Sequence, residues 1–209
     1  MISEEIFRKF ITDECSADAS HDINHIERVV KTAGKISAEE GADSEIVITA
    51  AWLHDCVMLP KKHPERKTAS KLAAEKAVTF LKETSFPSNK LTAVHHAIVA
   101  HSFSAGIEPE TLEAKTVQDA DRLDALGAIG TARCFMVGGD LDRPLYNPED
   151  PFCETRNPDD SVWTIDHFYK KLFLLPELLH TESAKKEAET RIRFMKSFLK
   201  QLKHEISDL

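Results

Sequence analysis

The sequence places a histidine and an aspartate next to each other at the end of an apolar stretch, at His54-Asp55. A charged pair at the end of a buried helix is costly unless something compensates it. A divalent cation would do so, because neutral imidazole and carboxylate are both good ligands. Both side chains can reach one ion only where the helix frays, and Pro60 predicts such an end. The alternative is a capped helix end with a hydrogen-bonded histidine.

A second histidine, His25, lies in the first turn of the preceding predicted helix. In an antiparallel helix pair the start of one helix lies beside the end of the next, so His25 and His54 could meet. Arg28 follows His25 by one turn on the same flank, where it could face a bound anion. His21 shares that flank, and we interpret it as a capping or supporting residue.

One short segment with otherwise largely apolar residues carries three carboxylates, Asp119, Asp121 and Asp124. If they were buried together they would repel each other and take up protons, unless counter-charges held them. A metal together with Arg122 or Arg28 would serve. The alternative is a set of surface carboxylates on an amphipathic helix.

A basic run follows closely after His54-Asp55 and contains Lys61, Lys62, His63, Arg66 and Lys67. A metal flanked by cations is suited to phosphate, because the ion polarises one oxygen while lysine and arginine neutralise others. We expect Lys61, Arg66 and Arg28 to bind substrate. A solvated run of charge is the alternative.

Three more histidines, His95, His96 and His101, share the predicted helix that begins near Leu91. His95 falls on the core face, so we expect it to be structural. His96 and His101 point in different directions on an ideal helix and can approach one site only if the helix ends near His101. Both are candidate catalytic residues.

The composition excludes several classes of function. The net charge of −8 and the pI of about 5.7 argue against binding of extended nucleic acid. The longest apolar run, 46–53, is far too short to cross a membrane. The acidic N-terminus lacks the pattern of an export signal, so we expect a cytoplasmic protein. The four cysteines form no Cys-x-x-Cys pair, which predicts reduced thiols.

Helical periodicity recurs along the chain, and it predicts an all-α fold. We expect helices over about 22–39, 46–53 (capped by Asp43), 72–81 and 91–98, and a helical stretch over 117–132 interrupted at Gly127 and Gly130. Residues 138–160, rich in glycine, proline and acidic residues, predict a long loop that either covers a site or is a solvated connector. We expect a single domain over 1–209, with its core at 20–135 and C-terminal helices over 161–209.

The last predicted helix carries a narrow apolar seam, which fits packing against its own domain better than a coiled coil. A homodimer is nevertheless compatible with this seam and with the long loop. The seam residues are Ala188, Ile192, Met195, Leu199, Leu202 and Ile206.

The ordered set of His25, His54-Asp55 and Asp121 resembles the HD-domain superfamily of metal-dependent phosphohydrolases, and most of all its small bacterial single-domain branch. Similarity to that branch runs through most of the chain and includes Leu59-Pro60-Lys61 and Asp150-Pro151-Phe152. The motifs that carry the resemblance are His21-Asp22-x-x-His25-x-x-Arg28-Val29, Leu53-His54-Asp55, His96-Ala97-Ile98-x-x-His101 and Gln118-Asp119-Ala120-Asp121-Arg122-Leu123-Asp124-Ala125.

The resemblance implies an HD-domain helical bundle, here with a C-terminal helical extension. It implies one divalent ion held by His25, His54, Asp55 and Asp121, and hydrolysis of a phosphate ester or anhydride, often of a nucleotide. The chain has Val57-Met58-Leu59 where the stringent-response hydrolases carry a Glu-Asp pair, and it lacks the Gly-Tyr-Pro signature of the cyclic-dinucleotide branch. Neither of those two activities is therefore expected.

On this basis we expect Asp55 to bind the metal and orient a water, and His96 or His101 to protonate the leaving oxygen. The spread of basic residues favours a nucleoside triphosphate pyrophosphohydrolase. Mn²⁺ is the favoured ion, while Mg²⁺, Ni²⁺, Fe²⁺ and Zn²⁺ also suit mixed histidine and carboxylate ligands.

Two alternatives remain open at this point. Some HD-fold proteins are oxygenases with two irons, and His63, His96 and His101 could supply the extra ligands. A non-catalytic regulatory module with a vestigial site is the other alternative. The number of metal ions per chain separates the first alternative from the hydrolase.

Overall fold

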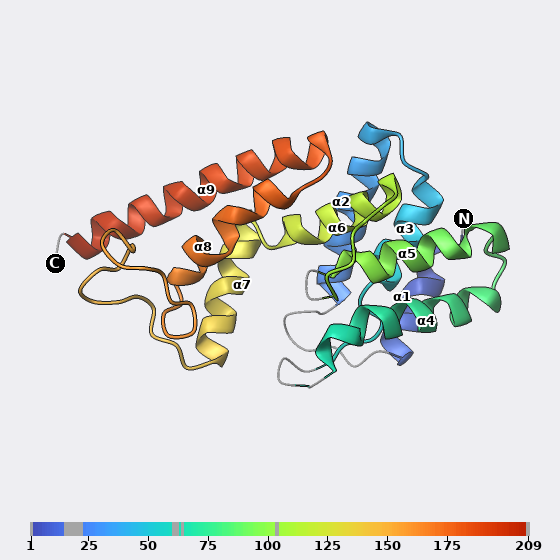
Figure 1. The fold of residues 1–209 in the computed structure, drawn as a ribbon, viewed down its shortest axis with the longest axis horizontal. Helices are drawn as coiled ribbons and strands as arrows, with labels where there is room; N and C mark the ends of the chain where they lie inside the picture. The colour runs from blue at the N-terminus through green and yellow to red at the C-terminus, as the bar shows by residue number, and fades with distance from the viewer. Residues whose placement is uncertain (1, 15–22, 60–62, 64, 103–104, 208–209) are drawn as a thin grey trace. The chain divides into compact units, whose positions relative to one another are not determined.

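The described part of the chain folds into helices joined by loops (Figure 1). The computed structural model describes residues 2–14, 23–59, 63, 65–102 and 105–207, and every regular element in those ranges is a helix. The predicted all-α fold is therefore confirmed. The α-helices are α1 (Glu4–Glu14), α2 (Ile23–Glu40), α3 (Ser44–Leu53), α4 (Ala69–Lys82), α5 (Leu91–His101), α6 (Leu112–Asp124), α7 (Gly127–Asp140), α8 (Asp166–Lys170) and α9 (Glu182–Ser207), and the described 3₁₀ helices are η1 (Arg66–Thr68), η2 (Ser88–Lys90) and η4 (Leu172–Leu178).

The contacts of the chain group into two compact units. The N-terminal unit comprises Met1–Asp121 and His180–Ser183, and the C-terminal unit comprises Arg122–Leu179 and Ala184–Leu209. The predicted organisation as one continuous domain stays a prediction. Within the described ranges no helix is long and apolar enough to cross a membrane.

In the N-terminal unit, helices α2 and α3 form a packed pair. The apolar face predicted for α2 is buried, including Val29 and Ala33, which have no exposed surface. Gly41 ends α2 with a φ of 77°, a conformation that glycine adopts without strain. Asp43 caps α3 as predicted, because its Oδ1 accepts hydrogen bonds from the backbone N–H groups of Glu45 (3.0 Å) and Ile46 (3.4 Å).

Helices α4 and α5 lie side by side in the same unit (Figure 1). Their facing small and aliphatic residues, among them Ala77 and Ile98, are fully buried. Helix α5 ends at His101, because Ser102 turns into an extended conformation. That end is the condition under which His101 could approach a site at the end of α3.

The stretch predicted as one interrupted helix over 117–132 is two helices, α6 and α7. The chain breaks at Ala125-Leu126, and Gly127 begins α7 with a φ of 74°. Gly130 lies inside α7, where a Cβ atom would stand only 2.1 Å from the carbonyl oxygen of Ala125. Gly127 therefore allows the break between the two helices, and Gly130 allows the close approach of the backbone at Ala125.

The long loop starts later than predicted, because α7 continues to Asp140. Gly138 is helical, and a Cβ atom on it would meet the Thr164 hydroxyl at 2.4 Å. This glycine permits close packing and does not form a turn, so the predicted loop boundary was wrong there.

The rest of the loop is held by its own hydrogen bonds. The Asp150 carboxylate accepts from the backbone N–H groups of Glu154, Thr155 and Arg156. The Arg156 guanidinium in turn forms two hydrogen bonds, of 2.5 and 2.7 Å, with the fully buried carboxylate of Asp166. The segment is therefore an internally braced loop and not a solvated connector.

Helix α9 carries the predicted seam. Ala188, Met195 and Leu199 are buried in the single chain. The Met195 sulfur accepts a hydrogen bond from the backbone N–H of Gly127 at 3.2 Å, which joins α9 to the start of α7 within the C-terminal unit. The expectation that α9 packs against its own chain is confirmed.

Candidate metal centre

Side chains from four segments of the N-terminal unit converge on one cluster. They are His25 on α2, His54 and Asp55 in the turn after α3, His101 at the end of α5, and Asp121 on α6. The Nε2 atom of His25 lies 3.5 Å from Asp121 Oδ1 and 3.8 Å from Asp55 Oδ2. The Nε2 atom of His54 lies 3.5 Å from Asp55 Oδ2 and 4.0 Å from Asp121 Oδ1. The Nε2 atom of His101 lies 3.5 Å from Asp55 Oδ1.

The end of α3 explains how adjacent residues reach the same place. The helix stops at Leu53, and the backbone N–H of Cys56 bonds the Leu53 carbonyl in a tight turn. His54 keeps helical backbone angles as the C-cap (φ −58°, ψ −36°), and the turn after it carries Asp55, so the predicted end of the helix lies one residue later than His54. The His54 and His101 rings then meet edge to face, with centroids 4.9 Å apart.

Backbone carbonyls fix the orientation of two of the imidazoles. The Nδ1 atom of His54 lies 2.7 Å from the Ala51 carbonyl oxygen, and that of His101 lies 2.6 Å from the Ile98 oxygen. A carbonyl only accepts, so each Nδ1 carries the proton and donates. Each Nε2 therefore points into the cluster, where it offers a lone pair whenever the ring is neutral. This arrangement is typical of histidines that bind metal ions.

Burial and neighbouring charge move the proton equilibria of the cluster. Burial lowers the pKa of His54, which favours its neutral form. Burial also acts against the charged form of His101, but hydrogen bonding to Asp55 and the negative charges of Asp55 and Asp121 together outweigh it and raise the pKa of His101. For Asp55, burial is outweighed by the surrounding histidines, which hold the pKa of that carboxyl well below its usual range.

These residues fit a divalent cation. The Nε2 atom of His54 is fully buried and has no hydrogen-bond partner among the described residues. It faces carboxylate oxygens, which are also acceptors, so a cation at their centre would satisfy both. Two sets of possible ligand atoms, each mutually within 4.8 Å, share His54: one with His25 and Asp121, the other with Asp55 and His101. Mixed nitrogen and oxygen ligands of this kind suit several divalent metals.

The three carboxylates of α6 are compensated separately. Only Asp121 joins the cluster. The Asp119 carboxylate accepts from the backbone N–H groups of His180 and Thr181, at 3.0 and 2.8 Å, and burial raises its pKa. Asp124 pairs with Arg133 at 2.6 Å in the C-terminal unit. Backbone N–H groups for Asp119 and Arg133 for Asp124 are partners that the sequence analysis did not name.

One buried residue next to the cluster was missed by the sequence analysis. The Gln118 side chain donates to the Ala100 carbonyl at 2.6 Å and bonds the His180 ring at 2.8 Å. Gln118 therefore links Ala100, the residue before His101, to His180, whose backbone N–H donates to Asp119. Gln118 stands in the motif around Asp121, but its residue type alone does not indicate a tie to α5.

The other histidines considered are not part of the cluster in the described contacts. His96 Nε2 accepts a hydrogen bond from the backbone N–H of Glu110 at 3.0 Å. His63 Nδ1 accepts from the backbone N–H of Glu65 at 3.2 Å. His95 is half-buried on α5. Of the two candidate catalytic histidines, the structure therefore brings only His101 to Asp55.

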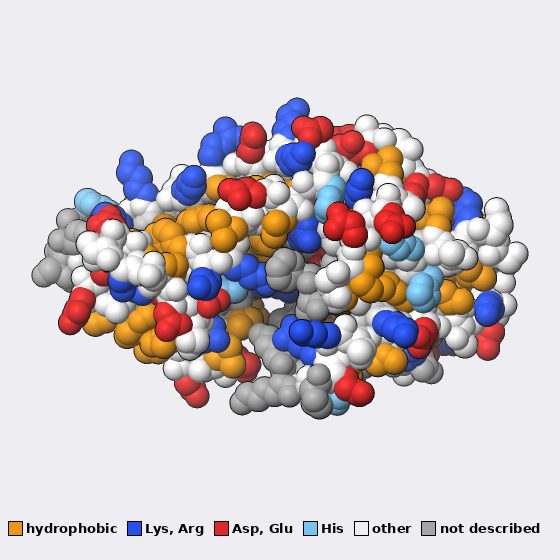
Figure 2. All heavy atoms as spheres, viewed as in Figure 1, with side chains coloured by type: hydrophobic (Ala, Val, Ile, Leu, Met, Phe, Trp, Pro, Cys, Tyr) orange, Lys and Arg blue, Asp and Glu red, His pale blue; other side chains and the backbone are white. Residues whose placement is uncertain are grey.

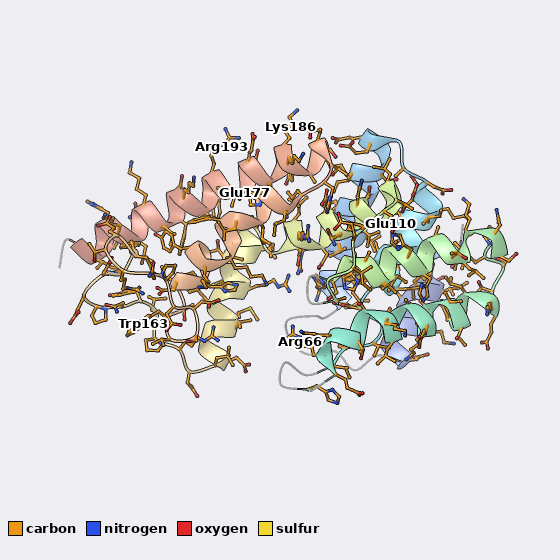
Figure 3. All side chains as sticks on the ribbon, viewed as in Figure 1. Arg66, Glu110, Trp163, Glu177, Lys186 and Arg193 are labelled. Atoms are coloured by element: carbon orange, nitrogen blue, oxygen red, sulfur yellow. The ribbon has the colours of Figure 1, made fainter. Side chains whose placement is uncertain are left out.

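Of the residues expected to bind substrate, only Arg28 and Arg66 belong to the part of the chain that the structure describes. Arg28 is half-buried on α2 and lines a separate hollow with Trp52 and Lys31. Arg66 is exposed in η1 (Figure 3). Lys61 and His21 lie outside the described residues. The substrate-binding roles of Arg28, Lys61 and Arg66 stay predictions.

Comparison with known proteins identifies the family. A model of the HD domain matches residues 22–126. YpgQ of Bacillus subtilis (strain 168) is 35% identical over 203 residues, which cover 95% of this chain and 89% of that protein. The crystal structure of an HD-superfamily hydrolase from Bacillus thuringiensis is 36% identical, with a TM-score of 0.75 over 99% of each chain. The crystal structure of YpgQ in complex with ADP is 32% identical, with a TM-score of 0.72 over 97% of this chain and 95% of that one.

The family match spans all five side chains of the cluster, and the relatives are similar along nearly the whole chain. Fold, cluster and sequence similarity lead to one conclusion: the chain belongs to the HD domain family of metal-dependent phosphohydrolases.

Proposed function

We propose that the protein hydrolyses a phosphoester or phosphoanhydride bond of a nucleotide at a single divalent ion held by His25, His54, Asp55 and Asp121. The observation that carries this proposal is the buried Nε2 atom of His54, a lone pair that faces carboxylate oxygens and has no proton donor among the described residues. The Ala51 carbonyl holds the ring in that orientation.

When bound, the ion supplies a Lewis acid for the phosphate and lowers the pKa of an attacking water. The residues of the chain supply the orientation. Asp55 lies within 3.8 Å of the Nε2 atoms of all three histidines of the cluster, so it is suited both to bind the ion and to orient the water. Asp121 is 30% exposed, so this side of the cluster is open to a ligand.

His101 is the stronger candidate for the proton donor to the leaving oxygen. It lies 3.5 Å from Asp55, and its ring is held by the Ile98 carbonyl. His96 instead bonds the backbone of Glu110. Proton transfer requires the donor to lie within hydrogen-bond reach of the reacting atoms, which favours His101.

The nucleotide as substrate is supported by a relative and by charge. YpgQ has been crystallised with ADP, and we extend a nucleotide ligand from that protein to this chain. The basic run from Lys61 to Lys67 follows His54 and Asp55 closely in sequence. A run of several cations fits more than one phosphate, so we propose release of pyrophosphate from a nucleoside triphosphate.

We also propose the identity of the ion, the cellular location and the oligomeric state of the protein. Mn²⁺ is the favoured ion, since two imidazoles and two carboxylates suit a mid-row metal. A cytoplasmic location and a homodimer belong to the same proposal.

The test is hydrolysis by the purified full chain with Mn²⁺, across ribo- and deoxyribonucleoside triphosphates, with identification of the products. The matched control is His54→Gln, which removes the imidazole Nε2 ligand while keeping a polar side chain of similar size. We expect pyrophosphate from the native chain and none from the variant. Equal turnover by both proteins, or no turnover of any nucleotide by the native chain, would refute the proposal.

One observation favours a second candidate, the di-iron oxygenase. His101 joins the cluster beside Asp55 Oδ1, while Asp55 Oδ2 faces His25 and His54, so this carboxylate could bridge two ions. His63 and His96, the other extra histidines, bond to backbone groups instead. Metal analysis decides between the candidates: one ion per chain supports the hydrolase, and two irons support the oxygenase.

A further inference from the structure

The C-terminal unit contains a hollow of about 480 Å³ that shares no residue with the metal cluster. This volume is within the range of small-molecule sites. Three segments line it: the braced loop, the α8–η4 region, and α9. The side chains that matter below are Phe152, Tyr169, Phe173, Lys196, Lys200 and Lys203.

The loop is built so that it holds Phe152 in the wall of this hollow. Asp150, two residues earlier, accepts three backbone hydrogen bonds, and Arg156 anchors the loop to Asp166. Cys153 adopts a φ of 56°, which is unfavourable for a residue with a Cβ atom. Such a conformation persists only where surrounding contacts impose it, and it is found disproportionately in binding sites.

The charge of the hollow is opposite in sign to that of the protein. Its lining contains three lysines and one glutamate, in a chain whose net charge is −8. Lys196, Lys200 and Lys203 follow one face of α9 at intervals of four and three residues. Lys203 pairs with Glu154, while no described carboxylate pairs with Lys196 or Lys200. The excess of positive charge favours an anionic ligand.

Aromatic rings alternate with these cations. The Nζ atom of Lys196 lies 5.9 Å from the centre of the Phe173 ring, and that of Lys203 lies 5.8 Å from the centre of the Phe152 ring. Tyr169 meets Phe173 edge to face, with centroids 5.6 Å apart. Figure 2 shows basic side chains along α9 beside hydrophobic ones. Rings that bind a flat apolar surface therefore stand next to ammonium groups that bind an anion.

A nucleoside phosphate combines these two features, because its base stacks on aromatic side chains and its phosphates pair with cations. We propose that the hollow is a second nucleotide site, which binds the base against Phe152, Tyr169 and Phe173 and the phosphates among the lysines, without a metal ion. This proposal does not depend on hydrolysis at the metal cluster.

The first test is calorimetric titration of the full chain in EDTA with ADP, adenosine and inorganic pyrophosphate. Because the ligand must offer both a ring and a charge, we expect ADP to bind at least about tenfold more tightly than either fragment. We expect the affinity for ADP to fall as salt is raised. Absence of ADP binding at millimolar concentration would overturn the proposal, and so would pyrophosphate binding as tightly as ADP.

Variants then locate the binding. Phe173→Leu removes a ring, and we expect ADP affinity to fall at least about fivefold. Lys200→Gln removes an exposed charge that breaks no ion pair, and we expect a loss of a few fold that shrinks in high salt. The matched control is Lys186→Gln, an exposed lysine near the start of the same helix, outside the hollow (Figure 3); it should bind ADP as the native chain does.

Two outcomes would reassign the hollow. ADP affinity unchanged in both Phe173→Leu and Lys200→Gln would place the nucleotide elsewhere on the chain and refute the proposal. If sedimentation velocity showed a dimer that Phe173→Leu dissociates, the hollow would be a surface for a second copy of the chain, and the nucleotide site would be refuted as well.

Discussion

His54 defines the metal centre because its two ring nitrogens have different environments. Nδ1 donates to a carbonyl of its own helix, and Nε2 is buried facing carboxylates. The ring cannot turn to satisfy Nε2 without leaving the Ala51 carbonyl unbonded, so the orientation is stable before any ligand arrives. Such preorganisation lets a site bind an ion without rearrangement.

Removal of one carboxylate should separate metal binding from folding. Asp121→Ala deletes a ligand that is 30% exposed, so the helical core does not depend on it. We expect loss of the bound ion and of hydrolysis, with an unchanged circular dichroism spectrum. Elemental analysis of the purified protein measures the ion, and Asp13→Ala, which removes an exposed carboxylate of α1, is the control. Full retention of metal by Asp121→Ala would refute its assignment as a ligand.

Loss of a basic residue should have the opposite effect. Lys61→Ala and Arg66→Ala should each keep the ion and raise the KM for a nucleoside triphosphate, because they remove a phosphate partner and no metal ligand. Steady-state kinetics across several triphosphates, alongside metal analysis, measures both quantities. Lys71→Ala, an exposed lysine of α4, is the comparison. Kinetics unchanged from the native chain would remove that residue from the substrate site.

For individual side chains, the sequence predicted which residues form the cluster but did not indicate whether His96 or His101 joins it. His54 and Asp55 could be found because a polar pair at the end of an apolar helix needs compensation, and His25 because an antiparallel helix pair brings it to that end. The choice of Asp121 rested on the resemblance to the HD-domain superfamily. His96 and His101 were equivalent by periodicity, and only the end of α5 at His101 separates them. That end depends on the backbone at Ser102, which the sequence marks only weakly.

The helices show how a glycine can have opposite meanings in two places. Gly127 begins α7 in a left-handed conformation, whereas Gly138 lies inside that helix against Thr164. Composition alone suggests a break at both. The sequence therefore predicted the break correctly at the first glycine and placed the start of the long loop too early at the second.

Two glycines of α7 should respond in opposite directions to the same substitution. Gly130→Ala places a Cβ atom 2.1 Å from a backbone oxygen, which cannot move without breaking the helix start, so we expect a loss of at least about 2 kcal/mol. Gly139→Ala meets nothing within 4 Å and should add roughly 0.5 to 1 kcal/mol. Urea unfolding measures both. Equal stability of the two variants would contradict the close approach at Gly130.

The ion pair that anchors the long loop gives a pH-dependent prediction. The Asp166 carboxylate is fully buried, and although burial opposes its charge, hydrogen bonds from Arg156 and from the backbone N–H of Asp159 lower its pKa. When folding lowers the pKa of a carboxyl group, that group stabilises the fold at any pH above its pKa in the unfolded chain. This stabilisation is lost as the pH falls through the pKa of the folded state. We therefore expect Asp166→Asn to cost about 3 kcal/mol at neutral pH.

The measurement is urea unfolding of native and Asp166→Asn protein from pH 7 downward. The difference between the two proteins should shrink as the pH falls below the usual carboxyl value of 3.8, where the native side chain gains its proton. Asp140→Asn, which changes an exposed carboxylate of α7, should show no such difference at any pH. A constant difference across the range would show that the charge of Asp166 is not what stabilises the loop.

For the whole molecule, the metal ligands all belong to one of the two units. An ion that binds the folded state stabilises what it contacts, by about 2.7 kcal/mol at a concentration a hundred times its Kd. We expect Mn²⁺ to slow amide hydrogen exchange most in α2, α3 and α5, and least in α8 and α9. Exchange followed by mass spectrometry with and without Mn²⁺ tests this. Equal slowing in both units would contradict a centre confined to the N-terminal unit.

The division into units is the part of the architecture that the sequence did not reveal. Helical periodicity continues on both sides of Asp121 and Arg122, because α6 itself crosses the boundary. The return of His180–Ser183 to the first unit depends on Asp119, a carboxylate read in the sequence as part of a charged cluster. Periodicity reports which face of a helix is apolar and not which distant segment it meets.

The hydrogen bonds of Asp119 also bear on how this architecture can be divided or recombined. The recognisable family segment stops at residue 126, yet the carboxylate two positions before Asp121 takes its donors from residues 180 and 181, and Glu40 accepts from the backbone of Ser183. A piece cut at the family boundary would leave that acidic group enclosed and without these donors. The metal-binding unit is thus made of two separate stretches of sequence. A shortened chain that keeps these hydrogen bonds must extend past residue 126 to include residues 180–183.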